Sequence, residues 1–144
     1  MVHALEKAHW LLKGNGRLID IHPLGEPPPI EVRLGQEIHH VGWLREEDDY
    51  IEYVQASEAI EAVIANGLFA REQEGTFAYT TYADTLADLQ CYLEMEWHDA
   101  FIEDVVAGRI EDLMSSIEPD QELILRDVIH IARLRPLPLT NTQL

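Results

Sequence analysis

The stretch from Gln121 to Leu134 constrains the fold most, because it is the longest strand candidate and carries apolar residues on both sides. One set of alternating positions holds Leu123, Leu125, Ile129 and Ile131, and the other holds Ile124, Val128, Ala132 and Leu134. Successive side chains of a strand point to opposite faces. A strand that is apolar on both faces is typically covered on both. We therefore expect much of this segment to be covered on both sides.

Shorter patterns predict the remaining elements. Arg17–His22 is mostly apolar, which predicts a central strand buried on both faces. Ile30–Leu34 and Glu37–Leu44 alternate around Gly35-Gln36, which predicts a hairpin. Three- and four-residue spacing of apolar side chains predicts helices, and β-prone composition predicts one more strand. These further elements are helices over 2–13, 86–97 and about 102–117, a helix that begins near 46–49 and is capped at 66–67, and a strand over 68–82 that allows a turn at 74–75.

Together these patterns predict one domain over residues 1–139 and a loose tail over 140–144. The expected fold is α/β or α+β, with a mixed, antiparallel-rich sheet of about five strands packed by helices. Thr85 and Asp88 match a capping box at the start of the third helix.

Charge and composition exclude several classes of function. The chain of 144 residues has 27 Asp+Glu against 10 Lys+Arg, a formal net charge of −17. This balance argues against binding to nucleic acid or to an anionic membrane surface. No apolar run reaches the ~20 residues that a membrane-spanning helix needs. One cysteine, Cys91, excludes an internal disulfide, and no signal peptide is visible, so we expect a cytoplasmic protein.

A helix, the turn Lys13-Gly14-Asn15-Gly16 and the apolar strand that follows form the strongest motif. This stretch resembles the C-terminal half of class I S-adenosylmethionine-dependent methyltransferases, where a helix ending in a Leu-Lys-Pro-Gly-Gly turn leads into the fifth strand. Gly14 stands where the family usually has proline, and Asn15 where it has glycine. The helix ending at Asn66-Gly67-Leu68-Phe69 is similar to the family's next helix, and the strand over 122–134 to its antiparallel seventh strand.

The family's cofactor-binding half has no counterpart here. That half holds a glycine-rich turn after the first strand, and this chain contains no G-x-G-x-G sequence. The resemblance therefore implies a chain that binds no cofactor and catalyses no methyl transfer by itself.

Few residues stand out as candidates for a site. His22 lies at the end of a predicted strand, and it could line a small-molecule pocket together with three aromatic residues, Trp43, Tyr79 and Tyr82. Glu94 and His98 share a helix face, but two residues do not make a metal site, and we expect no metal. Ser57 lies in no nucleophile-elbow sequence, and the three tryptophans are expected in the core.

Two functions are open at this point. The first is a non-catalytic, methyltransferase-derived module that forms a homodimer or completes a partner chain, including a split methyltransferase in which the partner supplies the missing half. Its physical basis is that unpaired apolar strand edges are usually covered. The second is a small cone-shaped α+β domain that binds or transforms a small molecule in a pocket.

Overall fold

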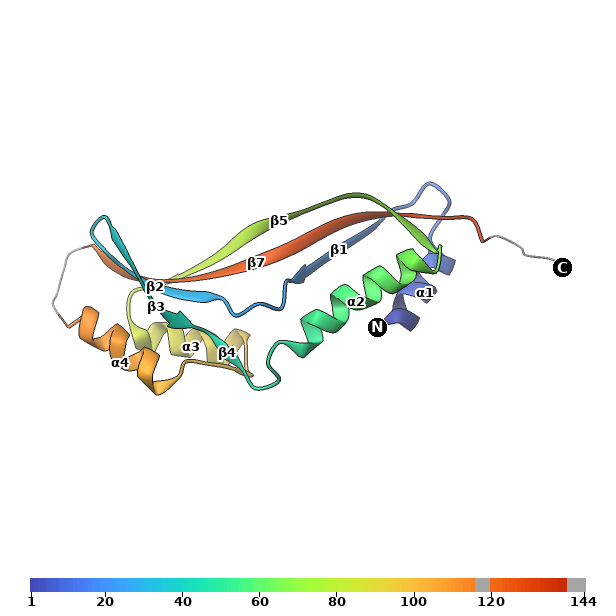
Figure 1. Ribbon diagram of the computed structural model, residues 1–144. Coiled ribbons are helices and arrows are strands. Elements are labelled where there is room, and N and C mark those ends of the chain that lie inside the picture. The colour runs from blue at the N-terminus through green and yellow to red at the C-terminus, as the bar shows by residue number, and fades with distance from the viewer. Residues whose placement is uncertain (116–119, 140–144) are drawn as a thin grey trace. The chain divides into compact units, whose positions relative to one another are not determined.

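The computed structural model describes residues 1–115 and 120–139. In these residues, four helices and an antiparallel sheet of five strands form an α+β fold, and a short strand pair lies outside the sheet (Figure 1). The order along the chain is α1 (Val2–Leu11), β1 (Leu18–Pro23), β2 (Pro29–Leu34), β3 (Glu37–Trp43), β4 (Arg45–Glu46), α2 (Ile51–Ala65), β5 (Phe69–Ala83), α3 (Leu86–Glu96), β6 (Ala100–Phe101), α4 (Asp104–Leu113) and β7 (Gln121–Pro136). The α+β class and the antiparallel sheet are thus confirmed. The predicted tail at 140–144 and the predicted helix end near Ile117 lie outside the described residues.

Strand β7 is the centre of the sheet, whereas β1, the strand predicted to be central, pairs with β7 alone among the described strands. The strand order is β1-β7-β2-β3, and β5 also pairs with β7. The C-terminal half of β7 pairs antiparallel with β1, so that His22 lies opposite His130 and Asp20 opposite Ala132. Its N-terminal half pairs antiparallel with β2, which in turn pairs with β3.

The chain divides into two compact units, and β5 and β7 contribute to both. Unit 1 contains Met1–Gly25, Ile51–Phe77 and the described part of Ile129–Leu144. Unit 2 contains Glu26–Tyr50 and the described part of Ala78–Val128.

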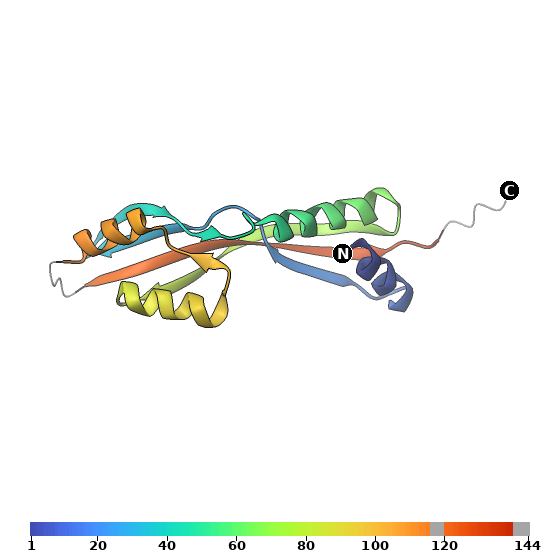
Figure 2. The same ribbon diagram turned by 90° about the horizontal axis from the view of Figure 1, so that it is seen from below.

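Unit 1 is a small sheet with helices on one face. Helices α1 and α2 cover the same face of β1, β7 and the first half of β5 (Figures 1 and 2). Apolar side chains from α2 and the strands form the core between them, namely Ile60, Val63, Phe69, Ala132 and Leu134. Gly67 follows the C-terminal end of α2 and has a φ of 72°, the left-handed conformation that glycine adopts without strain.

Unit 2 holds the larger core. The hairpin β2–β3, the first half of β7, α3 and α4 bury Ile30, Val32, Val41, Leu44, Leu89, Leu93, Val106, Ile110, Leu123 and Leu125. Helix α3 begins with the predicted capping box, because the Asp88 amide donates to Thr85 Oγ1 at 3.1 Å. The hairpin turn at Gly35, with φ of 60°, is also confirmed.

Three predictions are corrected by the structure. Strand β1 is not buried on both faces: β7 is its only strand partner among the described residues, and Ile19 and Ile21 are 52% and 58% exposed. Strand β5 runs without the turn predicted at 74–75. Trp10 and Trp43 lie at the surface rather than in the core, whereas Trp97 packs against the core of unit 2.

Among the described residues, no helix has the length and apolar character required to cross a membrane.

Candidate functional site

Three side chains of residue types that can ligate a metal meet on the helix-covered face of unit 1. Asp20 and His22 are two residues apart on β1, so alternation places both side chains on one face. His130 lies directly opposite His22 on the neighbouring strand β7. The potential ligand atoms of these three residues lie within 4.8 Å of one another. We call Asp20, His22 and His130 the His–Asp centre.

The His–Asp centre is largely shielded from water. The side chains of His22, Asp20 and His130 are only 9%, 17% and 17% exposed. Strand sequence explains this burial, because Ile19 and Ile21 occupy the alternate positions of β1 and point to the opposite face. Buried polar groups carry a cost of desolvation unless they have partners. The partners of these three side chains therefore decide what the centre can do.

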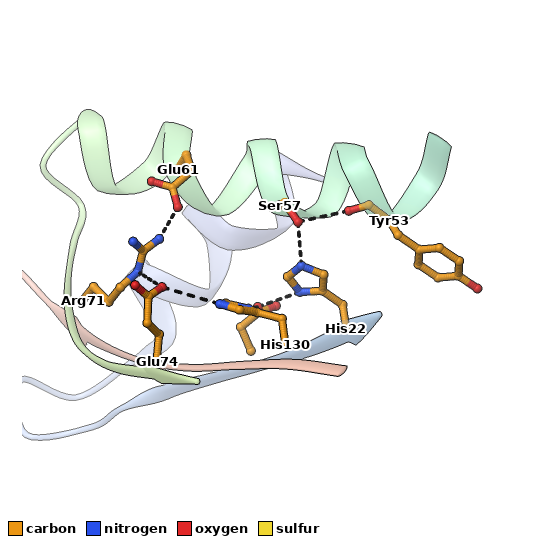
Figure 3. A network of polar contacts seen from close by, with 8 residues as sticks. His22, Tyr53, Ser57, Glu61, Arg71, Glu74 and His130 are labelled. Carbon is orange, nitrogen blue, oxygen red and sulfur yellow. Dashed lines mark hydrogen bonds and ion pairs between the residues drawn. The ribbon is translucent and has the colours of Figure 1, made fainter. Parts of the chain in front are cut away.

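Ser57 on α2 fixes the orientation of the His22 ring (Figure 3). The Ser57 hydroxyl lies 3.3 Å from the backbone carbonyl of Tyr53, one helical turn earlier, and 2.8 Å from His22 Nε2. A serine hydroxyl has one proton to donate. When that proton goes to the carbonyl, Ser57 accepts a hydrogen bond from His22 Nε2–H. This pattern leaves a lone pair on His22 Nδ1.

Glu74 on β5 has the corresponding position beside His130. Glu74 Oε2 lies 3.5 Å from His130 Nε2 and 3.1 Å from Arg71 Nε, and Arg71 also pairs with Glu61 on α2 (Figure 3). A carboxylate accepts and does not donate, so it favours the proton on His130 Nε2. The Nδ1 atom of His130 is then also a lone-pair donor to a cation.

Both Nδ1 atoms face the same carboxylate oxygen. Asp20 Oδ2 lies 2.7 Å from His22 Nδ1 and 3.6 Å from His130 Nδ1. All three atoms are fully buried, and within the described parts of the chain none makes a well-directed hydrogen bond. Two imidazole nitrogens and one carboxylate oxygen therefore converge on a common space. Two arrangements resolve it: a hydrogen bond from a protonated His22 Nδ1 to Asp20 Oδ2 at 2.7 Å, or a metal ion that contacts all three atoms.

One of the two separations is that of metal ligands. Bond lengths of about 2.1 Å around a tetrahedral zinc ion place two ligand atoms roughly 3.4 Å apart. The 3.6 Å between Asp20 Oδ2 and His130 Nδ1 is close to that value, whereas the 2.7 Å to His22 Nδ1 is a hydrogen-bond distance that would have to lengthen around an ion. The outer partners Ser57 and Glu74 correspond to the groups that commonly orient metal-binding histidines through their second ring nitrogen.

The order Ser57–His22–Asp20 also resembles the connectivity of a nucleophilic triad, but its surroundings do not support acyl transfer. Ser57 lies in the interior of α2, where backbone N–H groups are used in the helix. A nucleophilic serine needs two free donors nearby to stabilise the oxyanion. The Ser57 hydroxyl donates to the Tyr53 carbonyl, so we assign Ser57 a positioning role.

The sequence-predicted pocket residues are not brought together as a set. His22 is in the His–Asp centre of unit 1, whereas Trp43, Tyr79 and Tyr82 belong to unit 2 and are each more than half exposed. His98 lies just beyond the C-cap of α3, and its Nδ1 atom contacts the backbone carbonyl of Glu94 in the last turn at 2.6 Å.

Sequence reasoning missed Asp20, Ser57, Glu74 and His130. The spacing of Asp20 and His22 on one strand was a usable signal, since it places a carboxylate and an imidazole side by side. His130 had no such signal, because its position depends on the register between two strands that are far apart in the chain.

Unit 2 contains another group of acidic residues, Glu46, Asp48 and Asp99. Glu46 is buried and accepts a hydrogen bond from the Trp97 indole. Burial raises the pKa of Glu46 to about 7; the Trp97 hydrogen bond lowers it, and Asp48 raises it further. This group is sensitive to pH, but it has no histidine and no converging set of buried ligand atoms.

No protein-family model, no curated protein and no solved structure matches this chain.

Proposed function

We propose that unit 1 binds a divalent transition-metal ion through Asp20, His22 and His130. The observation that carries this proposal is the convergence of three buried ligand atoms whose lone pairs face one another. Two imidazoles and one carboxylate are a ligand set typical of zinc and of non-haem iron. Three protein ligands leave at least one coordination position for water or for an oxygen of a small molecule.

This proposal favours the small-molecule function over the purely structural module. A metal with an open position can bind a ligand and can activate water. The methyltransferase origin and the homodimer remain predictions from the sequence.

Calorimetric titration of the full chain with zinc, after removal of bound metal with a chelator, tests the proposal. We expect one zinc ion per chain and loss of binding, by about 100-fold or more, in His130→Gln and Asp20→Asn. His3→Gln is the matched control, because His3 is a fully exposed histidine of the same unit and is close to the amino terminus, itself a potential zinc ligand. Binding that survives Asp20→Asn but disappears in His3→Gln would contradict the proposal.

Asp20→Asn also separates the metal from a proton-bridged pair. An asparagine amide can donate to His22 Nδ1, so metal-free Asp20→Asn should fold with nearly unchanged stability. A centre held together by an Asp20–His22 ion pair would instead lose stability in this variant, and the wild-type chain would bind zinc no better than Asp20→Asn.

A further inference from the structure

The opposite face of the unit 1 sheet is not covered by either helix of that unit. Ile19 and Ile21 are more than half exposed there. On β1 these two side chains alternate with Asp20 and His22, so they point away from the His–Asp centre. Isolated exposed apolar residues are common, but a contiguous group on one sheet face is typical of a binding surface.

This face is hollowed into a groove of about 450 Å³. Ile19 and Ile131 line it with apolar surface, Arg133 adds a charged wall, and Gln73–Gly75 of β5 contribute the other side. The groove therefore offers an apolar contact next to a guanidinium group.

Three arginines gather around one glutamate beside the groove. Glu72 lies 2.8 Å from Arg17, 3.0 Å from Arg133 and 3.5 Å from Arg135. The hydrogen bond from Arg17, with the nearby charges of Arg17, Arg133 and Arg135, lowers the pKa of Glu72. Each guanidinium has five donors. Arg17 also donates to the carbonyls of Asn15 and Gly16, whereas Arg133 and Arg135, which share the Glu72 carboxylate, are 46% and 43% exposed. Glu74 also lines the groove, but it already pairs with His130 and Arg71.

The charge of this face is unusual for the chain. Only 10 residues of the whole sequence are Lys or Arg against 27 acidic ones, and three arginines lie together here. Electrostatic complementarity between surfaces favours a partner of opposite sign. A second copy docked face to face would bring these arginines against their own equivalents, so like charges would meet across that interface.

We propose that the outer face of unit 1, formed by Arg17, Ile19, Ile21, Ile131, Arg133 and Arg135, binds an acidic segment of a partner protein. Carboxylates of the segment pair with the arginines in bidentate geometry, and its apolar side chains enter the groove over Ile19 and Ile131. This surface is on the face opposite the His–Asp centre and does not depend on metal binding.

Fluorescence anisotropy of the full chain with a short labelled peptide of alternating glutamate and leucine tests the proposal. We expect saturable binding that weakens as salt is raised, and an affinity about tenfold lower in the double variant Arg133→Gln/Arg135→Gln. The matched control is Arg33→Gln/Arg126→Gln, in which each arginine of unit 2 also pairs with one glutamate. Ile21→Ser should weaken binding too, because it removes an apolar contact from the proposed surface. The variant should still fold, since Ile21 is exposed and lies outside the core.

Other outcomes would overturn the proposal. Equal binding of a lysine–leucine peptide would show that apolar contact alone drives association. Self-association that Ile21→Ser abolishes, measured by sedimentation, would assign the face to a second copy of the chain. Binding to anionic lipid vesicles, with none to the acidic peptide, would assign it to a membrane.

Discussion

At the scale of single residues, protonation of two histidine rings decides whether the His–Asp centre can hold a metal. Ser57 and Glu74 each lie beside one Nε2 atom, and this leaves both Nδ1 atoms facing Asp20. When both Nε2 atoms carry protons, a metal ion can contact both Nδ1 atoms at once, whereas a proton shared with Asp20 contacts one of them.

Ser57→Ala should lower zinc affinity by about tenfold without abolishing binding, because the hydroxyl orients His22 but is not itself a ligand. Titration of the variant beside the wild type measures this effect. The conservative variant Ser57→Thr keeps the hydroxyl and should recover most of the affinity. A complete loss of binding in Ser57→Ala would show that Ser57 is a ligand, and no change would remove its positioning role.

The candidate site was only partly predictable from the sequence at this scale. The sequence singled out His22 as a polar residue near the end of a strand, but it did not single out the partners that the structure places beside it. Asp20 is two residues from His22 on the same strand, so a local pattern could have found it. His130 reaches the site only through the β1–β7 register, which no local pattern encodes. Ser57 depends on where α2 crosses the strands, which is a matter of packing.

At the scale of elements, local patterns predicted most helices and strands, and tertiary context decided their burial. The β2–β3 hairpin, the capped helix α3 and the strand β7 follow from turn residues, a capping box and alternation. Strand β1 has the same apolar composition as a buried strand, but it lies at the sheet edge with one face exposed. Composition states that a strand is apolar; it does not state what covers it.

The buried acid Glu46 makes the β4–β6 region of unit 2 sensitive to pH. Its pKa is about 7 in the folded protein against a usual value of 4.5, so the folded state binds this proton more tightly than the unfolded state. The resulting stabilisation is fully present below pH 4.5 and is lost as pH rises through 7.

Glu46→Gln should reduce this pH dependence by about 1–3 kcal/mol between pH 5 and pH 8, measured by chemical denaturation. Some dependence of the same sign should remain, because burial also raises the pKa of Asp127 in β7. Glu47→Gln, at the exposed neighbouring position, serves as the control. A wild-type protein that gains stability from pH 5 to pH 8, with Glu46→Gln lacking that gain, would contradict the argument.

At the scale of the whole molecule, the two compact units should respond differently to metal. The His–Asp centre lies wholly in unit 1, and a ligand stabilises the part of a protein that binds it. A metal concentration 100 times the dissociation constant stabilises the folded state by about 2.7 kcal/mol.

Hydrogen exchange should therefore slow on zinc binding in β1, the C-terminal half of β7 and α2. Amides of the β2–β3 hairpin in unit 2 should exchange at the metal-free rate, and Asp20→Asn should show no zinc effect in either unit. Protection that appears first in unit 2 would place the metal at another site, such as the acidic group around Glu46.

The most direct test of the central claim reads the two histidine rings themselves. Long-range ¹H–¹⁵N correlation spectra of the labelled chain distinguish Nδ1 from Nε2 in each imidazole, with and without zinc. The account predicts that zinc shifts Nδ1 of both His22 and His130 to values of metal-bound nitrogen while both Nε2 atoms keep their protons. Unchanged Nδ1 signals for these two residues, or coordination through Nε2, would contradict it.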